Sequence, residues 1–305
     1  MYYPYLRSKQ NEMLALRDMA LSPNQYEYIV PIIEPVRDLP VLCRTTDVLE
    51  QHKIPYSVVL NTSDVPISDV WAVLHKEGYE CIIPALVCDG RIEEVKEYLD
   101  SSDMANVTLV FKDDMDTDNE VLFPLLEHTR VKTIVGSFNR SLKRTLHNTG
   151  KTLVTFNADA FQAKVSNSQY GACLNEKYTE EHSFFREDGF DGFSDFCVLP
   201  KVLQEGGMTP TTLAIHLTYK KNKDEIWVRH FLSDSNVGRE NIQHKFMEAA
   251  NHVKDFYVEH EHTEAVDVLL NNLETGHYPG LGTLKRYTVW NHLELVNRLL
   301  RDKEQ

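Results

Sequence analysis

Residues 80–112 read ECIIPALVCDGRIEEVKEYLDSSDMANVTLVFK, and this stretch indicates the fold. Residues 80–88 and 106–112 are short runs of apolar and β-branched residues, which are typical of strands covered on both faces. Residues 92–99, between the two runs, carry a helical pattern. A strand, a helix and a second strand in this order form a unit in which the two strands are parallel.

The same alternation extends in both directions along the chain. Further strands are expected at residues 28–36, 56–61, 131–137 and 152–157, and further helices at 47–52, 68–77, 120–128 and 141–148. Six strands by residue 160, with two or three more to follow, favour a closed (β/α) barrel over an open doubly wound sheet. No GxGxxG motif follows the first of these strands, which weakens a dinucleotide-binding interpretation further.

The regular alternation ends after Asp159. Residues 160–190 are polar and long for a loop, and such loops are usually functional lids or contact surfaces. We expect the seventh strand at 193–200 and the eighth at 213–219, with residues 225–232 returning as an antiparallel hairpin partner. An ideal barrel does not end in this way. The expected fold is therefore α/β, a distorted (β/α)8 TIM-barrel-like fold with a C-terminal antiparallel hairpin and helical tail.

The last part of the chain is helical in pattern. Apolar residues recur there at three- and four-residue spacing, which marks one buried helix stripe: Ile242, Phe246, Ala249, Val253 and Phe256. Two more helices are expected near 264–273 and 288–301. We therefore predict a barrel-like domain over residues 1–237 and a C-terminal helical extension over residues 238–305, packed on the barrel.

The composition limits the classes of partner. The chain has 305 residues, and its 46 acidic against 32 basic side chains give a net charge of −14. This charge disfavours direct nucleic-acid binding, because phosphate contacts need clustered Lys and Arg, and residues 140–151 are the only basic run. Five cysteines without CxxC spacing indicate a reducing compartment. Without an apolar leader or a run of eighteen apolar residues, we expect a cytoplasmic protein with no membrane span.

The predicted hairpin carries the sharpest candidates for catalysis, namely His216, Arg229 and His230. If the apolar faces of its two strands align, His216 and Arg229 share one face and lie nearly opposite each other. A one-residue slip would instead pair His216 with His230. A histidine near an arginine has a depressed proton affinity, so it could stay neutral and act as a base or ligand. A hydrogen-bonded structural histidine is the alternative.

Carboxylates supply the other catalytic candidates. Polar residues are expected at the carboxyl ends of the barrel strands, where function collects in this fold: Glu34, Asn61, Asp89, Lys112, Asp113, Ser137, Asn157 and Asp159. Asp159 and Asp195 are the carboxylates we assign to a catalytic site. The run EDGFDGFSDF (187–196) could also hold Mg²⁺ or Ca²⁺ through Asp188, Asp191 and Asp195, or could simply form a tight turn. The sequence does not indicate a particular metal or cofactor.

A candidate anion site lies in HYPGLGTLKR (277–286), just before the last helix. Its residues would be Gly280, Gly282, Thr283 and Lys285, with backbone N–H groups and a helix N-terminus facing the anion. The spacing of a Walker motif is absent, and a glycine-built turn between two helices is the alternative.

Several blocks of the chain resemble the beta family proteins of phages and bacteria. These blocks are YYPYLRSKQNEMLALRD (2–18), IVPIIEPV (29–36), EDGFDGFSDF (187–196), AIHLTY (214–219), VRHFLSDSN (228–236) and YPGLGTLKRYTVWNHLELV (278–296). The likeness is greatest to a bacterial subgroup that begins with the same tyrosine–proline–tyrosine–leucine–arginine phrase. The resemblance implies no settled activity. It does imply a setting in prophages and variable islands, often beside another small gene, and hence a role in phage–host conflict with a protein partner.

Two functions follow as hypotheses. The first is a cytoplasmic binding or accessory component of a phage-conflict (anti-phage defence) protein complex, with a partner encoded nearby and with oligomers allowed. The alternative is a hydrolase acting on a phosphate-bearing small molecule or nucleotide. It would use His216, Arg229, His230 and nearby carboxylates, with anion capture by Thr283 and Lys285.

Overall fold

The computed structural model describes residues 1–22, 26–37, 39–74, 78–203 and 209–304. Eight parallel strands form a nearly closed barrel: β1 (Tyr5–Arg7), β2 (Ile32–Glu34), β3 (Tyr56–Val59), β4 (Ile82–Val87), β5 (Val107–Val110), β6 (Val131–Gly136), β7 (Thr152–Asn157) and β9 (Gly192–Asp195). Tyr2 closes the ring, because it bridges both Ile29 ahead of β2 and Phe193 in β9. The expected distorted (β/α)8 barrel is confirmed.

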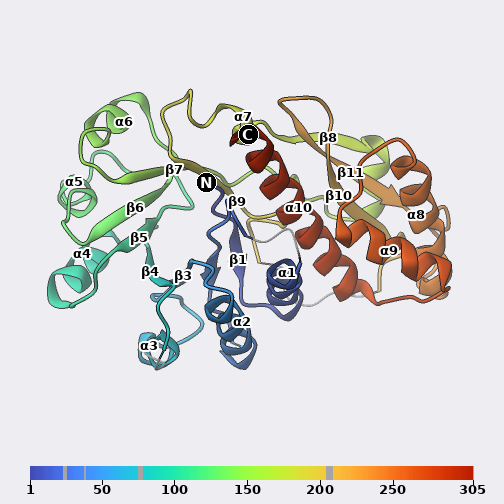
Figure 1. Cartoon of the computed structure of the whole chain (residues 1–305), viewed down its shortest axis with the longest axis horizontal. Coiled ribbons are helices and arrows are strands. Elements are labelled where there is room, and N and C mark those ends of the chain that lie inside the picture. Colours follow the sequence, from blue (N-terminus) through green and yellow to red (C-terminus); the bar gives the residue numbers. More distant parts are fainter. Residues whose placement is uncertain (23–25, 38, 75–77, 204–208, 305) are drawn as a thin grey trace.

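Helices alternate with these strands and lie outside them, at the left and centre of Figure 1. They are α1 (Gln10–Leu21), α2 (Leu39–Gln51), α3 (Ile67–Leu74), α4 (Ile92–Ser101), α5 (Leu122–Leu126) and α6 (Arg140–Leu146). Strands β3 and β5 are buried along their whole length. Burial on both faces explains why the strands read as continuous apolar runs rather than as alternating patterns.

The count of barrel strands differs from the prediction in one respect. Tyr5–Arg7 pairs with Ile32–Glu34 as the first strand, and a segment of three residues is too short to show a period in the sequence. Residues 192–195 are therefore the eighth barrel strand rather than the seventh. The prediction that residues 213–219 form a barrel strand is wrong, because they belong to a separate sheet.

That second sheet has three antiparallel strands in the order β10–β11–β8. The predicted hairpin is confirmed as β10 (Ala214–Lys220) and β11 (Ile226–Leu232), and β8 (Asn175–Thr179) pairs with β11. The third strand thus comes from the segment 160–190, which was expected to be irregular. The same segment also contains the 3₁₀ helix η1 (Asn167–Ala172) and the short helix α7 (Glu181–Phe184).

Three helices complete the chain: α8 (Ile242–Tyr257), α9 (Glu264–Glu274) and α10 (Leu281–Glu304). Helix α8 packs against the three-stranded sheet, whereas α10 crosses between the two halves of the molecule and contacts both α1 and β10 (Figure 1). One continuous hydrophobic core joins the barrel, α10, the second sheet and α8. The helical tail is therefore shared between the barrel and the second sheet.

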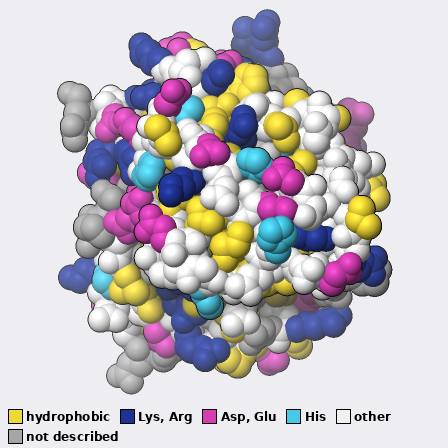
Figure 2. All heavy atoms as spheres, turned by 90° about the vertical axis from the view of Figure 1, so that its right-hand side faces the viewer, with side chains coloured by type: hydrophobic (Ala, Val, Ile, Leu, Met, Phe, Trp, Pro, Cys, Tyr) yellow, Lys and Arg dark blue, Asp and Glu magenta, His cyan; other side chains and the backbone are white. Residues whose placement is uncertain are grey.

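The side of the molecule that carries the three-stranded sheet and its helices is shown in Figure 2. Acidic, basic, histidine and hydrophobic side chains are interspersed there, and among its described residues no patch of a single kind dominates. Within the described ranges, no helix has the length and apolar character needed to cross a membrane.

Candidate functional site

The register of the hairpin decides which histidine neighbours which residue. His216 on β10 lies opposite His230 on β11, and their Nδ1 atoms are 2.7 Å apart. Arg229 instead lies opposite Leu217 and points to the other face of the sheet. The one-residue slip considered from the sequence is confirmed, and the expected convergence of His216 with Arg229 is wrong.

The surroundings of Arg229 explain why aligning the apolar faces of β10 and β11 predicted the wrong register. Its guanidinium lies over the rings of Phe231 and Phe256, at 5.4 and 4.7 Å from the two centroids, and donates to Asn175 Oδ1 at 3.1 Å. An arginine that stacks on aromatic rings can occupy an otherwise apolar face. We therefore assign Arg229 to packing between the sheet and α8, not to a catalytic site.

The histidine pair continues into a polar chain that crosses to β8. His230 Nε2 is 3.4 Å from Glu176 Oε2, and Glu176 Oε1 is 3.2 Å from Lys164 Nζ. We call Glu176, His230 and His216 the histidine relay. If His230 Nε2 carries the proton that faces the carboxylate, its Nδ1 must accept from His216 Nδ1. His216 Nε2 then has a free lone pair, because the bond to His230 is the only hydrogen bond of the His216 side chain among the described residues.

Both imidazoles of the relay are held in the neutral form. Burial, together with a smaller effect of the neighbouring His230, lowers the pKa of His216 to about 3. Burial also lowers the pKa of His230, while Glu176 opposes that shift. A proton taken up by the pair therefore settles on His230, next to the carboxylate. The expectation of a neutral His216 was right in direction, but the cause is burial and His230 rather than Arg229.

Two aromatic residues hold the rings of the relay in place. The Tyr170 ring centroid lies 4.7 Å from that of His216 and 4.3 Å from that of His230. Phe161 meets the edge of His216 at 5.5 Å. The Tyr170 hydroxyl accepts a hydrogen bond from the backbone N–H of Lys164, so the segment that carries Lys164 is fixed to the same cluster. Packing of this kind keeps both imidazoles in one orientation.

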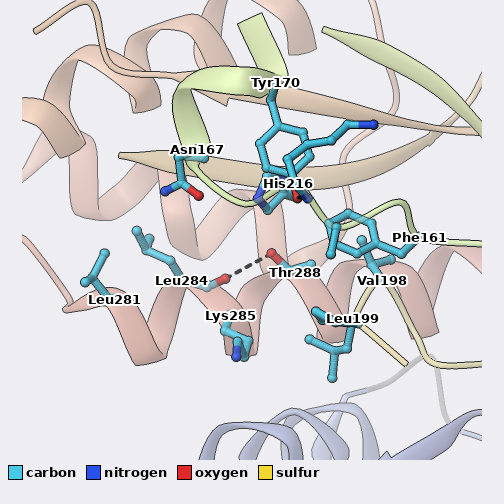
Figure 3. Close-up of a pocket in the computed structure, with 14 residues that line it drawn as sticks. Phe161, Asn167, Tyr170, Val198, Leu199, His216, Leu281, Leu284, Lys285 and Thr288 are labelled. Carbon is cyan, nitrogen blue, oxygen red and sulfur yellow. Dashed lines mark hydrogen bonds between the residues drawn. The ribbon is translucent and has the colours of Figure 1, made fainter. Parts of the chain in front are cut away.

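His216 opens into a cavity of about 210 Å³, which we call the His216 cavity. In Figure 3 the segment with Asn167 and Tyr170 covers it from above, the first turns of α10 lie below, and Val198 and Leu199 lie to one side. Polar groups from three directions line it, namely Lys164, Asn167, His216, Lys285 and Thr288. Sites of this size and mixed lining suit small organic ligands.

Only part of the predicted anion site borders this cavity. Lys285 and neighbouring residues of α10 line it, whereas Gly280, Gly282 and Thr283 do not. Gly280 has φ +92°, a left-handed conformation that favours glycine, and Gly282 lies against the Asn11 side chain, where a Cβ atom would clash. The two glycines thus serve the chain turn and the packing of α10 on α1, the alternative noted from the sequence.

Asp195 does not line the His216 cavity and is buried, with 1% exposure. It accepts hydrogen bonds from Tyr2 Oη at 2.8 Å, Tyr178 Oη at 2.9 Å and the backbone N–H of Cys197 at 2.6 Å. Its other oxygen is 3.8 Å from His292 Nε2. Burial raises the pKa of Asp195, but His292 and these donors outweigh burial and lower it overall. The catalytic prediction for Asp195 is replaced by a structural role.

That role concerns a strained turn that follows β9. Cys197 and Val198 have φ values of +54° and +63°, which are unfavourable for residues with a Cβ atom and most so for a β-branched one. Asp195 fixes the N–H of Cys197 and Tyr178 Oη accepts from the N–H of Val198 at 2.9 Å. The turn ends the strand five residues before the predicted end at 200 and brings Val198 and Leu199 to the His216 cavity.

Asp159 belongs to a different cavity, at the carboxyl ends of the barrel strands. This barrel-mouth cavity has a volume of about 400 Å³. Its lining is Phe111, Lys112, Asp113, Asp114, Ser137, Phe156, Asn157, Ala158, Asp159 and Lys201. The sequence-predicted ring at the strand ends is thus partly assembled here, but without His216 or Asp195.

The acidic run 187–196 does not form a metal site. Asp191 Oδ2 accepts from the backbone N–H of Leu153 at 2.8 Å, Gly189 adopts φ +75° in a tight turn, and Asp195 is buried elsewhere. Across the described ranges, no group of three or more His, Cys, Asp or Glu residues is arranged to hold a metal ion.

Four residues around the relay were missed from the sequence, namely Phe161, Lys164, Tyr170 and Glu176. All four lie in the segment 160–190, whose polar composition concealed β8. A weak signal existed in NEKYT (175–179), because alternate residues of a strand share a face and Glu176 therefore lies with Tyr178. Nothing in the sequence showed that this strand would pair with β11.

Comparison with protein-family models and with curated proteins gave no match. The functional assignment therefore rests on the geometry of the two cavities and on the chemistry of the side chains that line them.

Proposed function

We propose that the chain is a hydrolase that acts on a small phosphate-bearing molecule, such as a nucleotide, in the His216 cavity. The observation that carries this proposal is the histidine relay, which leaves a neutral, aromatic-clamped imidazole facing a cavity. A carboxylate behind a histidine is the usual means of fixing the tautomer of a general base. In this chain His230 lies between the carboxylate of Glu176 and His216.

In the proposed reaction His216 Nε2 takes a proton from water as the water oxygen bonds to phosphorus. The bond from phosphorus to the leaving oxygen breaks, and the proton passes from His216 to that oxygen. The imidazolium formed in between shares its Nδ1 proton with His230, which Glu176 stabilises. Lys164 pairs with Glu176 and limits how far the carboxylate raises the proton affinity of the pair.

Anion capture falls first to the N-terminal end of α10, while Lys285 lines the edge of the cavity with its side chain turned away from His216 in Figure 3. Leu281, Leu284 and Lys285 line the cavity, so the first turns of a 24-residue helix border it. The N-terminus of a helix carries partial positive charge, which favours a phosphate group. Val198, Leu199 and Leu284 supply apolar walls that exclude bulk water and strengthen these interactions.

The test is phosphate release from a panel of nucleoside mono-, di- and triphosphates and p-nitrophenyl phosphate. We expect turnover by the native chain, a loss of at least about 100-fold in kcat for His216→Ala, and a loss of about 10-fold for Glu176→Gln. Lys285→Ala should raise KM more than it lowers kcat. His244→Ala, on the exposed face of α8, is the matched control. Full activity in His216→Ala, or no turnover of any panel member, would contradict the proposal.

A second candidate, a binding component of a cytoplasmic phage-conflict complex, is supported by exposed apolar side chains in the segment 160–190. Val165 is 98% exposed and Leu174 is 39% exposed. Apolar residues of this kind on a contact segment fit a protein partner encoded nearby, as the beta family resemblance implies. Light scattering of the chain with and without that partner tests it. A complex that Val165→Asp weakens supports the candidate, and masses that do not change on mixing contradict it.

A further inference from the structure

We propose that the barrel-mouth cavity is a second binding site, for a small uncharged polyhydroxyl compound of the monosaccharide class. The site lies at the carboxyl ends of β5, β6 and β7, the end of a parallel barrel at which ligands bind. It uses none of the residues that line the His216 cavity. The inference therefore stands independently of the hydrolase proposal.

Several polar groups of the cavity lining have hydrogen-bonding capacity left over. Within the described part of the chain, the side chains of Ser137, Asn157 and Asp159 form no hydrogen bond. Lys112 Nζ has one carboxylate partner, Glu34 at 3.3 Å, and Lys201 Nζ has one, Asp113 at 2.7 Å. Each ammonium group retains further N–H donors. The lining therefore offers unpaired donors and acceptors side by side, which hydroxyl groups match because each hydroxyl both donates and accepts.

The lining of the barrel-mouth cavity carries more negative than positive charge. Asp113, Asp114 and Asp159 outnumber the two lysines of the lining, and both lysines already face a carboxylate. Like charges repel strongly in a partly enclosed site, so a phosphate or carboxylate ligand is disfavoured. The acidic lining therefore disfavours anions in the barrel-mouth cavity. In the His216 cavity, by contrast, Lys285 and α10 favour them. An uncharged ligand meets no such penalty.

Tyr5 contacts two residues of the cavity lining. Tyr5 is 1% exposed, and its hydroxyl lies close to the Glu34 carboxylate without a hydrogen bond of good geometry among the described residues. Its ring lies 6.1 Å from the ring of Phe156, which lines the cavity, and Lys112 Nζ lies 5.6 Å from its centroid. These contacts hold Phe156 and Lys112, two residues of the cavity lining, in place.

Saturation-transfer NMR with D-glucose, D-ribose, D-glucosamine and glucose 6-phosphate tests the proposal on the full chain. We expect transfer to at least one neutral sugar, weaker transfer to the phosphorylated one, and a loss of affinity of about 10-fold or more in Asn157→Ala and in Asp159→Asn. Asn251→Ala and Asp255→Asn, which make the same changes on exposed positions of α8, should bind as the native chain does.

Three results would overturn it. The first is no transfer to either neutral sugar. The second is transfer that Asn157→Ala and Asp159→Asn leave intact, which places the sugar elsewhere. The third is binding of glucosamine or glucose 6-phosphate with none of glucose or ribose, which assigns a charged ligand to the cavity. Circular dichroism of each variant confirms that it is folded, and none of these results bears on phosphate release at His216.

Discussion

Burial and the neighbouring His230 both lower the pKa of His216. The folded-state pKa of about 3 lies below the ordinary value of 6.5. Between these two values the unfolded chain binds a proton that the folded chain does not. The contribution to stability is therefore fully present above pH 6.5 and is lost as the pH falls toward 3.

The prediction is that the native chain loses more stability between pH 7.5 and 4.5 than His216→Asn does. The difference in the free energy of unfolding should be on the order of 2 kcal/mol, after allowing for the partial exposure of the ring. Denaturant unfolding at the two pH values measures it. The variant is needed because His182, with a pKa lowered to about 4, acts in the same direction, and Glu12, raised to about 6, acts in the opposite one. Equal losses in both chains would contradict the neutral assignment.

Asp195 gives a second prediction at the residue scale. Asp195→Asn weakens the interactions with His292 and with three donors in a buried site, so we expect unfolding to become about 3 kcal/mol easier. Asp191→Asn is the matched control, because that exposed carboxylate accepts only the N–H of Leu153 among the described residues. Thermal and denaturant unfolding compare the two, and equal costs would show that Asp195 has no special role in holding the turn.

At the scale of elements, α10 protects the open edge of the second sheet. Asn291 Nδ2 donates to the backbone carbonyl of Thr218 at 2.9 Å, and Asn291 Oδ1 accepts from Thr263 Oγ1 at 2.8 Å. The side chain is fully buried. A sheet edge that is covered in this way is unavailable for pairing with another chain.

Asn291→Ala should therefore destabilise the fold by about 2 kcal/mol, because it leaves a buried carbonyl and a buried hydroxyl with fewer partners. It should also increase aggregation on mild heating. Asn251→Ala on the exposed face of α8 should change stability by less than about 0.5 kcal/mol. Denaturant unfolding and light scattering compare the two variants. Equal stability and equal aggregation would show that Asn291 of α10 does not protect the sheet edge.

The elements also show what the sequence could and could not predict. Most barrel strands were predictable because burial on both faces makes them continuously apolar, as in β3 and β5. β1 was missed because it has three residues, and β8 because a polar strand such as NEKYT differs little from a loop. The register of β10 against β11 could not be chosen, since Arg229 occupies an apolar face by stacking on Phe231 and Phe256.

At the scale of the whole molecule, the barrel and the second sheet are joined by α10. Its residues pack on α1 and on β10, and one hydrophobic core includes all of these elements. The two cavities lie on either side of the segment 198–201, since Val198, Leu199 and Pro200 line one and Lys201 lines the other. The sequence named residues of both cavities but could not separate them, because that division depends on how distant segments meet.

A fragment of residues 1–237 should therefore fail to fold, although the sequence suggested a domain of that extent. Without α10 it would expose the apolar face of α1 and open the β10 edge. The full chain should unfold in one cooperative transition by circular dichroism and calorimetry. A fragment with a cooperative transition of its own would show that the barrel does not depend on the helical tail.

The most direct test of the account is nitrogen-15 NMR of the histidine side chains near pH 7. We predict a neutral His216 with the proton on Nδ1 and an unprotonated Nε2, and a neutral His230 with the proton on Nε2 beside Glu176. That result leaves a free base at the cavity, as the hydrolase proposal requires. A His216 that is charged, or that carries its proton on Nε2, would contradict the histidine relay and with it the proposed catalytic role.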